Sequence, residues 1–179
     1  MKDLEEFFND INELKHTERE GWKDVVDRPR DTIASHSFGA ALLGWALSEK
    51  EGLESDKIVK MLLMHDLIMA YVEDFTPEDE EFDSKKEMER EASERLFNDI
   101  PDEIEDEFRD LFHELQEQET EEARFAKECD KLDTLFQASK YSEETGEDHL
   151  REFLDFYREN FESDTGKKVF SSLEQKSFE

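Results

Sequence analysis

The chain has 179 residues, enough for one compact domain with its own hydrophobic core. Its 52 acidic and 23 basic residues give a formal net charge of −29, so it would repel nucleic-acid backbones and anionic lipid, which excludes both as expected partners. Disorder is excluded for most of the length because 15 Phe, two Trp and three Tyr recur at helical spacing.

The acidic residues are spread over every segment of the chain instead of forming one block. This distribution indicates a halophilic protein, because at about 1 M salt the Debye length falls to roughly 3 Å and self-repulsion is screened. The alternative is an ordinary acidic protein. The N-terminal residues MKDLEEFFNDINELK contain no apolar signal segment, no run approaches the ~20 apolar residues of a membrane span, and Cys129 has no disulfide partner. The sequence therefore predicts a cytoplasmic protein.

Few prolines and glycines, with apolar residues at i, i+3 and i+4, predict a single all-α domain over residues 1–179. In chain order, helices are expected over residues 4–14, 32–50, 55–65, 84–96, 101–115, 120–136, 150–161 and 168–173. Gly52 is expected to end the second helix, while Ser55 and Thr120 are expected N-caps. Residues 21–31 are expected to be irregular, and the third helix to continue towards a turn at residues 75–77. Ile104 is expected to face inward, and Trp45 to be a packing residue.

Four polar residues interrupt the apolar faces of three expected helices: His36, the adjacent His65 and Asp66, and Asp130. An ionised aspartate beside an apolar face is costly unless it is paired or binds a cation. Two imidazoles and two carboxylates suit Mn, Fe, Co, Ni or Zn, which can lower the pKa of a water molecule to make a nucleophile. Taken singly, each residue also fits a hydrogen-bonded core histidine, a chance His-Asp pair or a solvated aspartate.

The order H…HD…D resembles the HD-domain phosphohydrolase superfamily, and three stretches resemble its 5′-deoxynucleotidase branch. Arg28-Pro29 with residues 34–37 is similar to RPESVAEHS, MLLMHDLIMAYVEDFTP to ALLHDLAEAYVGDIPP, and EEARFAKECDKLDTLFQASKY to EARFVKDLDKLDMLLQAYEYE. The resemblance extends, more weakly, over about residues 21–168. It implies a helical bundle around one divalent metal ion and hydrolysis of a nucleoside 5′-monophosphate, in the best-known members a deoxynucleotide.

The resemblance also implies roles for individual residues. Its metal ligands fall on His36, His65, Asp66 and Asp130. The candidate divalent ions are Mn, Co, Fe, Ni, Zn and Mg. Asp133 falls on an acidic family position outside the ligands. Asp74 matches an aspartate that acts on the water or the leaving oxygen. The family's phosphate-binding basic residue corresponds to one of Lys23, Arg28 and Arg30, and many members form homodimers.

One departure from the family pattern concerns catalysis. Met69 stands where the nucleotidases have a functional Glu, and Glu73 stands where they usually have Gly. On a continuing helix these positions would share one face, so Glu73 is a candidate replacement for the missing carboxylate, or simply another acidic surface residue. Two alternatives to an active enzyme therefore stay open. One is a degenerate HD protein that binds metal or nucleotide without turnover, and the other is an acidic helical interaction module without metal.

Overall fold

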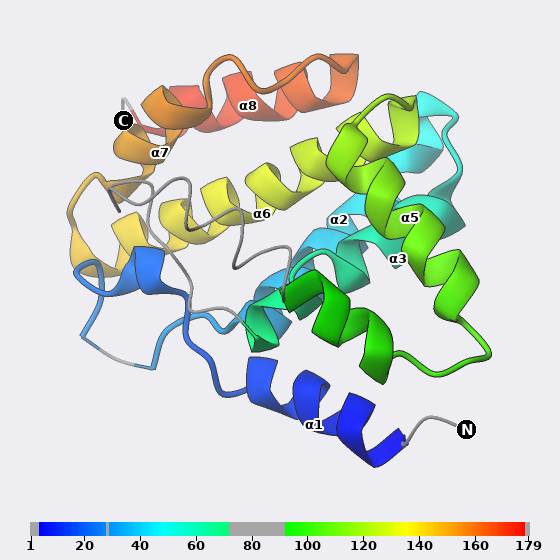
Figure 1. Ribbon diagram of the computed structural model, residues 1–179. Coiled ribbons are helices and arrows are strands. Elements are labelled where there is room, and N and C mark those ends of the chain that lie inside the picture. Colours follow the sequence, from blue (N-terminus) through cyan, green and yellow to red (C-terminus); the bar gives the residue numbers. More distant parts are fainter. Residues whose placement is uncertain (1–3, 28, 72–91, 178–179) are drawn as a thin grey trace.

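The computed structural model describes residues 4–27, 29–71 and 92–177, which form a bundle of helices (Figure 1). This confirms the predicted all-α class. The helices are α1 (Leu4–Leu14), α2 (Ile33–Glu51), α3 (Ser55–Met64), α5 (Glu105–Glu117), α6 (Glu121–Thr145), α7 (His149–Tyr157) and α8 (Asp164–Ser177), with 3-10 turns η1 (Glu20–Trp22) and η2 (Leu67–Ala70). Residues 92–99 are also helical.

Helix α2 begins and ends where the sequence predicts. The Thr32 hydroxyl accepts a hydrogen bond from the Ser35 amide, which satisfies a backbone donor that has no partner inside the helix. Gly52 ends the helix at φ 72°, in the left-handed region that favours glycine. Thr120 caps α6 in the same way, by accepting from the Ala123 amide.

Helix α6 is the centre of the bundle, with α2, α3, α5, α7 and α8 packed around it (Figure 1). Its two halves serve two apolar clusters. The first half packs with α1, α2, α3 and α5, and the second half packs with Trp22, α7 and α8. Helix α2 and the end of α3 thus pack against the same stretch of the central helix α6. No helix in the described ranges is both long and apolar enough to cross a bilayer.

The third predicted helix is shorter than expected. Helix α3 ends at Met64, with Glu54 at its N-cap in place of Ser55, and the backbone of Asp66 leaves helical geometry (φ −106°, ψ 7°) before η2 begins. The prediction that the third helix continues beyond His65 is therefore wrong as far as Tyr71. The shared face proposed for Met69 and Glu73 stays a prediction, because Glu73 lies outside the described residues. The end of α3 has a local cause, because the His65 ring forms a hydrogen bond with the Leu62 carbonyl in the last turn of the helix.

Three further expectations need correction. Helix α5 begins at Glu105, not Pro101, and Ile104 is exposed although its spacing predicted an inward position. Helix α6 continues to Thr145, nine residues beyond the predicted end at Phe136. Trp45, whose size suggested a packing residue, is 59% exposed on α2. In each case the packing of neighbouring helices decides what local spacing leaves open.

Candidate metal centre

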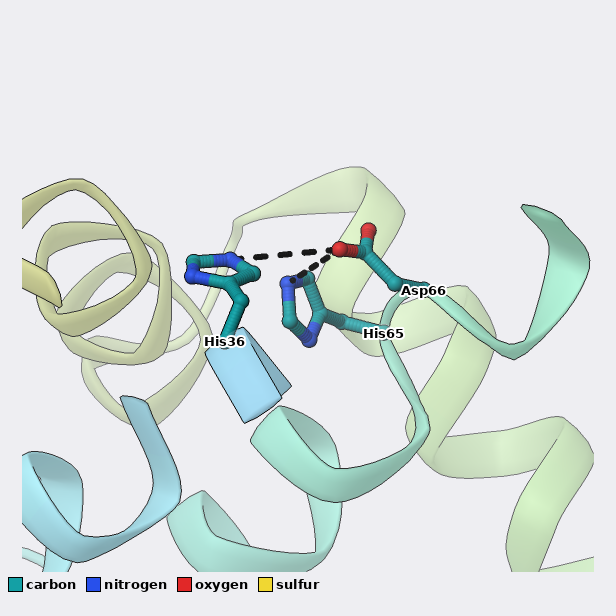
Figure 2. A group of neighbouring side chains, drawn as sticks. All are labelled: His36, His65 and Asp66. Atoms are coloured by element: carbon teal, nitrogen blue, oxygen red, sulfur yellow. Dashed lines mark ion pairs between the residues drawn. The ribbon is translucent and has the colours of Figure 1, made fainter. Parts of the chain in front are cut away.

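Three helices bring the four predicted ligand residues to one point. His36 comes from α2, His65 and Asp66 follow the last turn of α3, and Asp130 comes from α6. Both imidazoles are almost completely buried, with 1% and 5% of each residue exposed. Figure 2 shows the His36 and His65 rings facing the Asp66 carboxylate from two sides. Residues that are 94 positions apart in the chain thus share one small polar centre inside an apolar bundle.

The distances between the donor atoms are short. His36 Nε2 lies 3.0 Å from Asp130 Oδ1 and 3.9 Å from Asp66 Oδ2. His65 Nε2 lies 3.2 Å from Asp66 Oδ2 and 3.7 Å from Asp130 Oδ1. Two ligand atoms each about 2.1 Å from a metal ion are about 3 Å apart when they meet it at a right angle. All four separations are therefore compatible with one ion between the two nitrogens and the two oxygens.

The hydrogen bonding of His65 points to a cation. Its Nδ1 donates to the Leu62 carbonyl at 2.7 Å, which leaves Nε2 as the acceptor nitrogen of a neutral ring. Nε2 is buried and has no hydrogen-bond partner within the described structure. A lone pair directed at carboxylate oxygens is unfavourable unless a proton or a metal ion lies between them. The residues present therefore fit a metal centre.

His36 is arranged in the same way through a different partner. Its Nδ1 lies 2.7 Å from Oδ2 of Asp133, one turn beyond Asp130 on α6. Because a carboxylate only accepts, Nδ1 donates to Asp133. Nε2 in turn lies 3.0 Å from the Asp130 carboxylate, so it needs either a second proton or a metal ion between the two atoms. Asp31, His36 and Asp133 form a second acidic group around this ring. The hydrogen bond occupies Nδ1, so Asp133 serves as a partner of the ligand histidine, not as a further ligand.

The electrostatics of the cluster express the same need for positive charge. Burial of His65 disfavours its charged form, but the charge of Asp66 and the contacts with Asp130 outweigh it and raise the pKa of His65 to about 10. Burial would raise the pKa of Asp66, yet the His65 charge brings it down to about 2. The two imidazoles also lower the pKa of Asp130. Without a metal ion, protons on the imidazole rings supply the positive charge inside the cluster.

Two other predicted site residues, Lys23 and Arg30, are not brought into this cluster. The Arg30 guanidinium is held by Glu18, with Nε 2.7 Å from Oε2, and Lys23 is exposed and paired with Glu20 at 3.6 Å. Arg28, Glu73 and Asp74 lie outside the described residues. Met69 lies in η2, where its side chain packs against the apolar cluster.

Arg19 is a cation near the cluster that the sequence did not single out. Its positive charge opposes the protonation of His36, and its guanidinium donates to Thr134 at 3.2 Å. Burial raises the pKa of Asp31, and the charge of Arg19 partly offsets this effect. The chain folds back on itself here, because the Arg19 amide donates to the Asp31 carbonyl and Glu18 pairs with Thr32. This return places Arg19 beside the start of α2. No spacing in the sequence signals such a bridge.

Lys131 and Tyr157 are two further polar side chains near the cluster. Burial lowers the pKa of Lys131, although the neighbouring Asp130 carboxylate opposes this effect. Burial raises the pKa of Tyr157, and the charge of Asp130 adds to this effect. Tyr157, the last residue of α7, thus lies at the edge of the centre. Together with Arg19, they supply cationic and phenolic groups that can face an anionic ligand.

Comparison with known proteins gives matches along nearly the whole chain. The family model described as HD domain matches residues 11–174. The 5′-deoxynucleotidase HDDC2 of Dictyostelium discoideum is 31% identical, over 97% of this chain and 98% of that protein. The crystal structure of the PH0347 protein from Pyrococcus horikoshii OT3 superposes with a TM-score of 0.78 at 28% identity, over 96% and 98% of the two chains. A predicted metal-dependent phosphohydrolase from Magnetospirillum magnetotacticum MS-1 gives 0.73 at 27%, over 96% and 89%.

Proposed function

This chain belongs to the HD-domain family, and on that ground we propose that it is a metal-dependent phosphohydrolase that converts nucleoside 5′-monophosphates to nucleoside and phosphate. The observation that carries the proposal is the buried, unpartnered Nε2 of His65, directed at two carboxylates. The name of the Dictyostelium relative supports a deoxynucleotide as the preferred substrate.

In this proposal His36, His65, Asp66 and Asp130 hold one divalent ion. Such an ion lowers the pKa of a water molecule and neutralises charge on a phosphoryl oxygen. The chain's own groups do the rest of the work. Arg19, whose charge acts on His36, is the candidate partner of the phosphate, with Lys131 as a second cation near Asp130. Water oxygen joins phosphorus, the bond from phosphorus to the 5′ oxygen breaks, and a proton reaches that leaving oxygen, with Asp74 as the proposed donor.

The test is metal analysis followed by a phosphate-release screen. Purified protein is analysed for bound metals, then assayed with ribo- and deoxynucleoside monophosphates in molar salt with Mn²⁺, Co²⁺ or Mg²⁺. Asp66→Ala should lose both metal and activity, whereas Asp110→Ala removes an exposed carboxylate of α5 and should keep both. Wild-type protein that binds none of these ions would exclude the proposal.

A second candidate function follows from Met69. Because an apolar side chain packs where the nucleotidases carry a functional carboxylate, the protein could bind metal and nucleotide without turnover. Such a protein would bind Mn²⁺ and a deoxynucleotide in calorimetry but release no phosphate with any ion. An enzyme would release phosphate, and Met69→Glu would then change the rate without creating the metal centre.

We also propose that the chain forms a homodimer through an apolar face of α2. Phe38, Leu42 and Trp45 follow one another at i, i+4 and i+7 and are 61%, 47% and 59% exposed. Leu63 and Ile104 continue this face beside a groove of about 430 Å³. Among the described residues that line it, Lys60 and Glu107 are the charged ones, and they form an ion pair.

A second copy is the occupant that this face suits. Aromatic side chains bury 150–250 Å² each, so these half-exposed residues supply roughly 500 Å² of the ~800 Å² that each partner contributes to a stable interface. Among the described residues that line the groove beside this face, the carboxylate of Glu107 is paired with Lys60, which limits repulsion there between two copies of charge −29. Light scattering after size exclusion should show a dimer for the wild type and a monomer for Trp45→Glu. Phe156→Glu, at an exposed site on α7, should stay dimeric, and a monomeric wild type would exclude the idea.

The sequence-based expectations of a halophilic source and a cytoplasmic location stay predictions. The first is tested directly by the salt dependence of stability described below.

A further inference from the structure

We propose that Asp133 is a positioning residue of the metal centre and that Gly39 is required because it leaves room for the Asp133 carboxylate. The inference rests on the proposed metal-dependent function and concerns two residues that bind no metal themselves. It starts from the hydrogen bond of 2.7 Å between His36 Nδ1 and Asp133 Oδ2.

This hydrogen bond decides which nitrogen of His36 is available to a metal. A neutral imidazole has one N–H and one lone pair, and the position of the N–H fixes the position of the lone pair. With Nδ1–H donating to Asp133, a neutral ring has its lone pair on Nε2, where a metal ion would take the place of the proton that Nε2 otherwise shares with Asp130 at 3.0 Å. If Asp133 moved away, the ring would lose the hydrogen bond at Nδ1 that holds it in that tautomer and orientation.

Gly39 determines whether Asp133 can make this contact. Gly39 lies one turn after His36 on α2, so both face α6. A Cβ added at Gly39 would overlap Oδ1 of Asp133 and lie 3.2 Å from its Cγ. The carboxylate cannot simply turn aside, because its other oxygen is bound to His36. An alanine at position 39 would therefore push Asp133 away from the imidazole.

A purely structural explanation of Gly39 is that α2 and α6 need a small residue where they pack together. Gly44 provides a matched control for this explanation. It lies on the same helix, and an added Cβ there would overlap Leu62 and lie 3.0 Å from a methyl of Ile58, far from any charged group of the centre. Gly39→Ala and Gly44→Ala thus introduce the same methyl against a tight neighbour, but only the first disturbs Asp133.

The experiment measures metal binding without relying on activity. Chelator-stripped protein is titrated with Mn²⁺ by calorimetry and with Co²⁺ by its visible absorption, and folding of each metal-free variant is checked by circular dichroism. Asp133→Asn, which keeps the shape of the side chain, and Gly39→Ala should each weaken metal binding about 10- to 100-fold, as is usual for partners of ligand histidines, and should change the Co²⁺ spectrum. Gly44→Ala should bind as the wild type does.

The double variant Gly39→Ala with Asp133→Asn should bind no more weakly than Asp133→Asn alone, because both changes act through one hydrogen bond. Metal affinity within about threefold of the wild type in folded Asp133→Asn would overturn the proposal while leaving the metal-dependent function intact. Equal weakening in Gly39→Ala and Gly44→Ala would reduce Gly39 to a packing residue and overturn its assigned role. Absence of any metal binding by the wild type would instead remove the proposed function itself.

Discussion

Two carboxylates on helix α6, those of Glu128 and Asp130, have completely different surroundings. Glu128 is 4% exposed and accepts hydrogen bonds from the Glu162 amide at 2.6 Å, the Ser163 amide at 2.9 Å and the Ser163 hydroxyl. Asp130 faces two imidazole nitrogens and a second aspartate. Backbone amides before α8 satisfy the first carboxylate, whereas the second still needs positive charge.

The comparison shows that a buried acid does not by itself identify a functional site. Glu128 holds the start of α8 against α6, with help from Glu51, which accepts from the Thr165 amide at 2.8 Å. These donors come from the chain itself and are permanent. Around Asp130 the other groups are titratable, so the balance of charge depends on protons or on a bound cation. What surrounds the carboxylate therefore separates a structural role from a chemical one.

The largest expected effect comes from Asp130→Asn. Because the neutral amide removes a ligand charge from the centre, metal affinity should fall by more than the 10- to 100-fold typical of outer partners. Calorimetry with Mn²⁺ and a phosphate-release assay measure the loss. An Asp130→Asn protein that keeps wild-type metal affinity would place Asp130 in the same structural class as Glu128.

Glu128→Ala should affect folding instead of binding. The substitution leaves the amides of Glu162 and Ser163 without their acceptor, which costs about 1–3 kcal/mol of unfolding free energy. Urea unfolding measures this loss, and metal affinity should be unchanged in the folded variant. A drop in metal affinity comparable to that of Asp130→Asn would contradict the separation of the two sites.

The centre around Asp130 should also make the stability of the metal-free protein depend on pH, through His65. In metal-free protein the pKa of His65 is raised to about 10 from an ordinary value near 6.5. A group whose pKa is raised in the folded state contributes its full stabilisation of the folded protein below about pH 6.5. This contribution is lost as the pH rises towards 10. Unfolding free energy in chelator should therefore fall over that window, by up to about 1.4 kcal/mol per pH unit. His65→Gln should remove this component, and an unchanged profile in that variant would exclude the cause.

The smallest of these effects is the dependence of stability on salt, which comes from the charge of the whole protein. With a net charge of −29, raising salt from 0.1 M to 1 M should stabilise the protein, because the Debye length falls from about 10 Å to about 3 Å. Each 1 kcal/mol gained raises the melting temperature by about 2–4 °C in a chain of this size. The loss caused by Glu128→Ala should not change with salt, since the partners of Glu128 are two backbone amides and a hydroxyl, which carry no net charge. A melting temperature that falls with added salt would contradict adaptation to high salt.

The sequence by itself determined the helical class, the ends of α2 at Thr32 and Gly52, and the N-cap of α6 at Thr120, because spacing and capping are local properties. It also singled out His36, His65, Asp66 and Asp130 as a set, through the order H…HD…D.

Tertiary structure decided everything that depends on distant partners. The end of α3 at Met64, the return that places Arg19 near His36, and the contact between Asp133 and the space above Gly39 have no local signal. The same holds for Trp45, which the sequence assigned to packing and the helix arrangement leaves exposed. The physical reason is that local energies fix where a helix forms, whereas the facing side chains of other helices decide what each residue contacts.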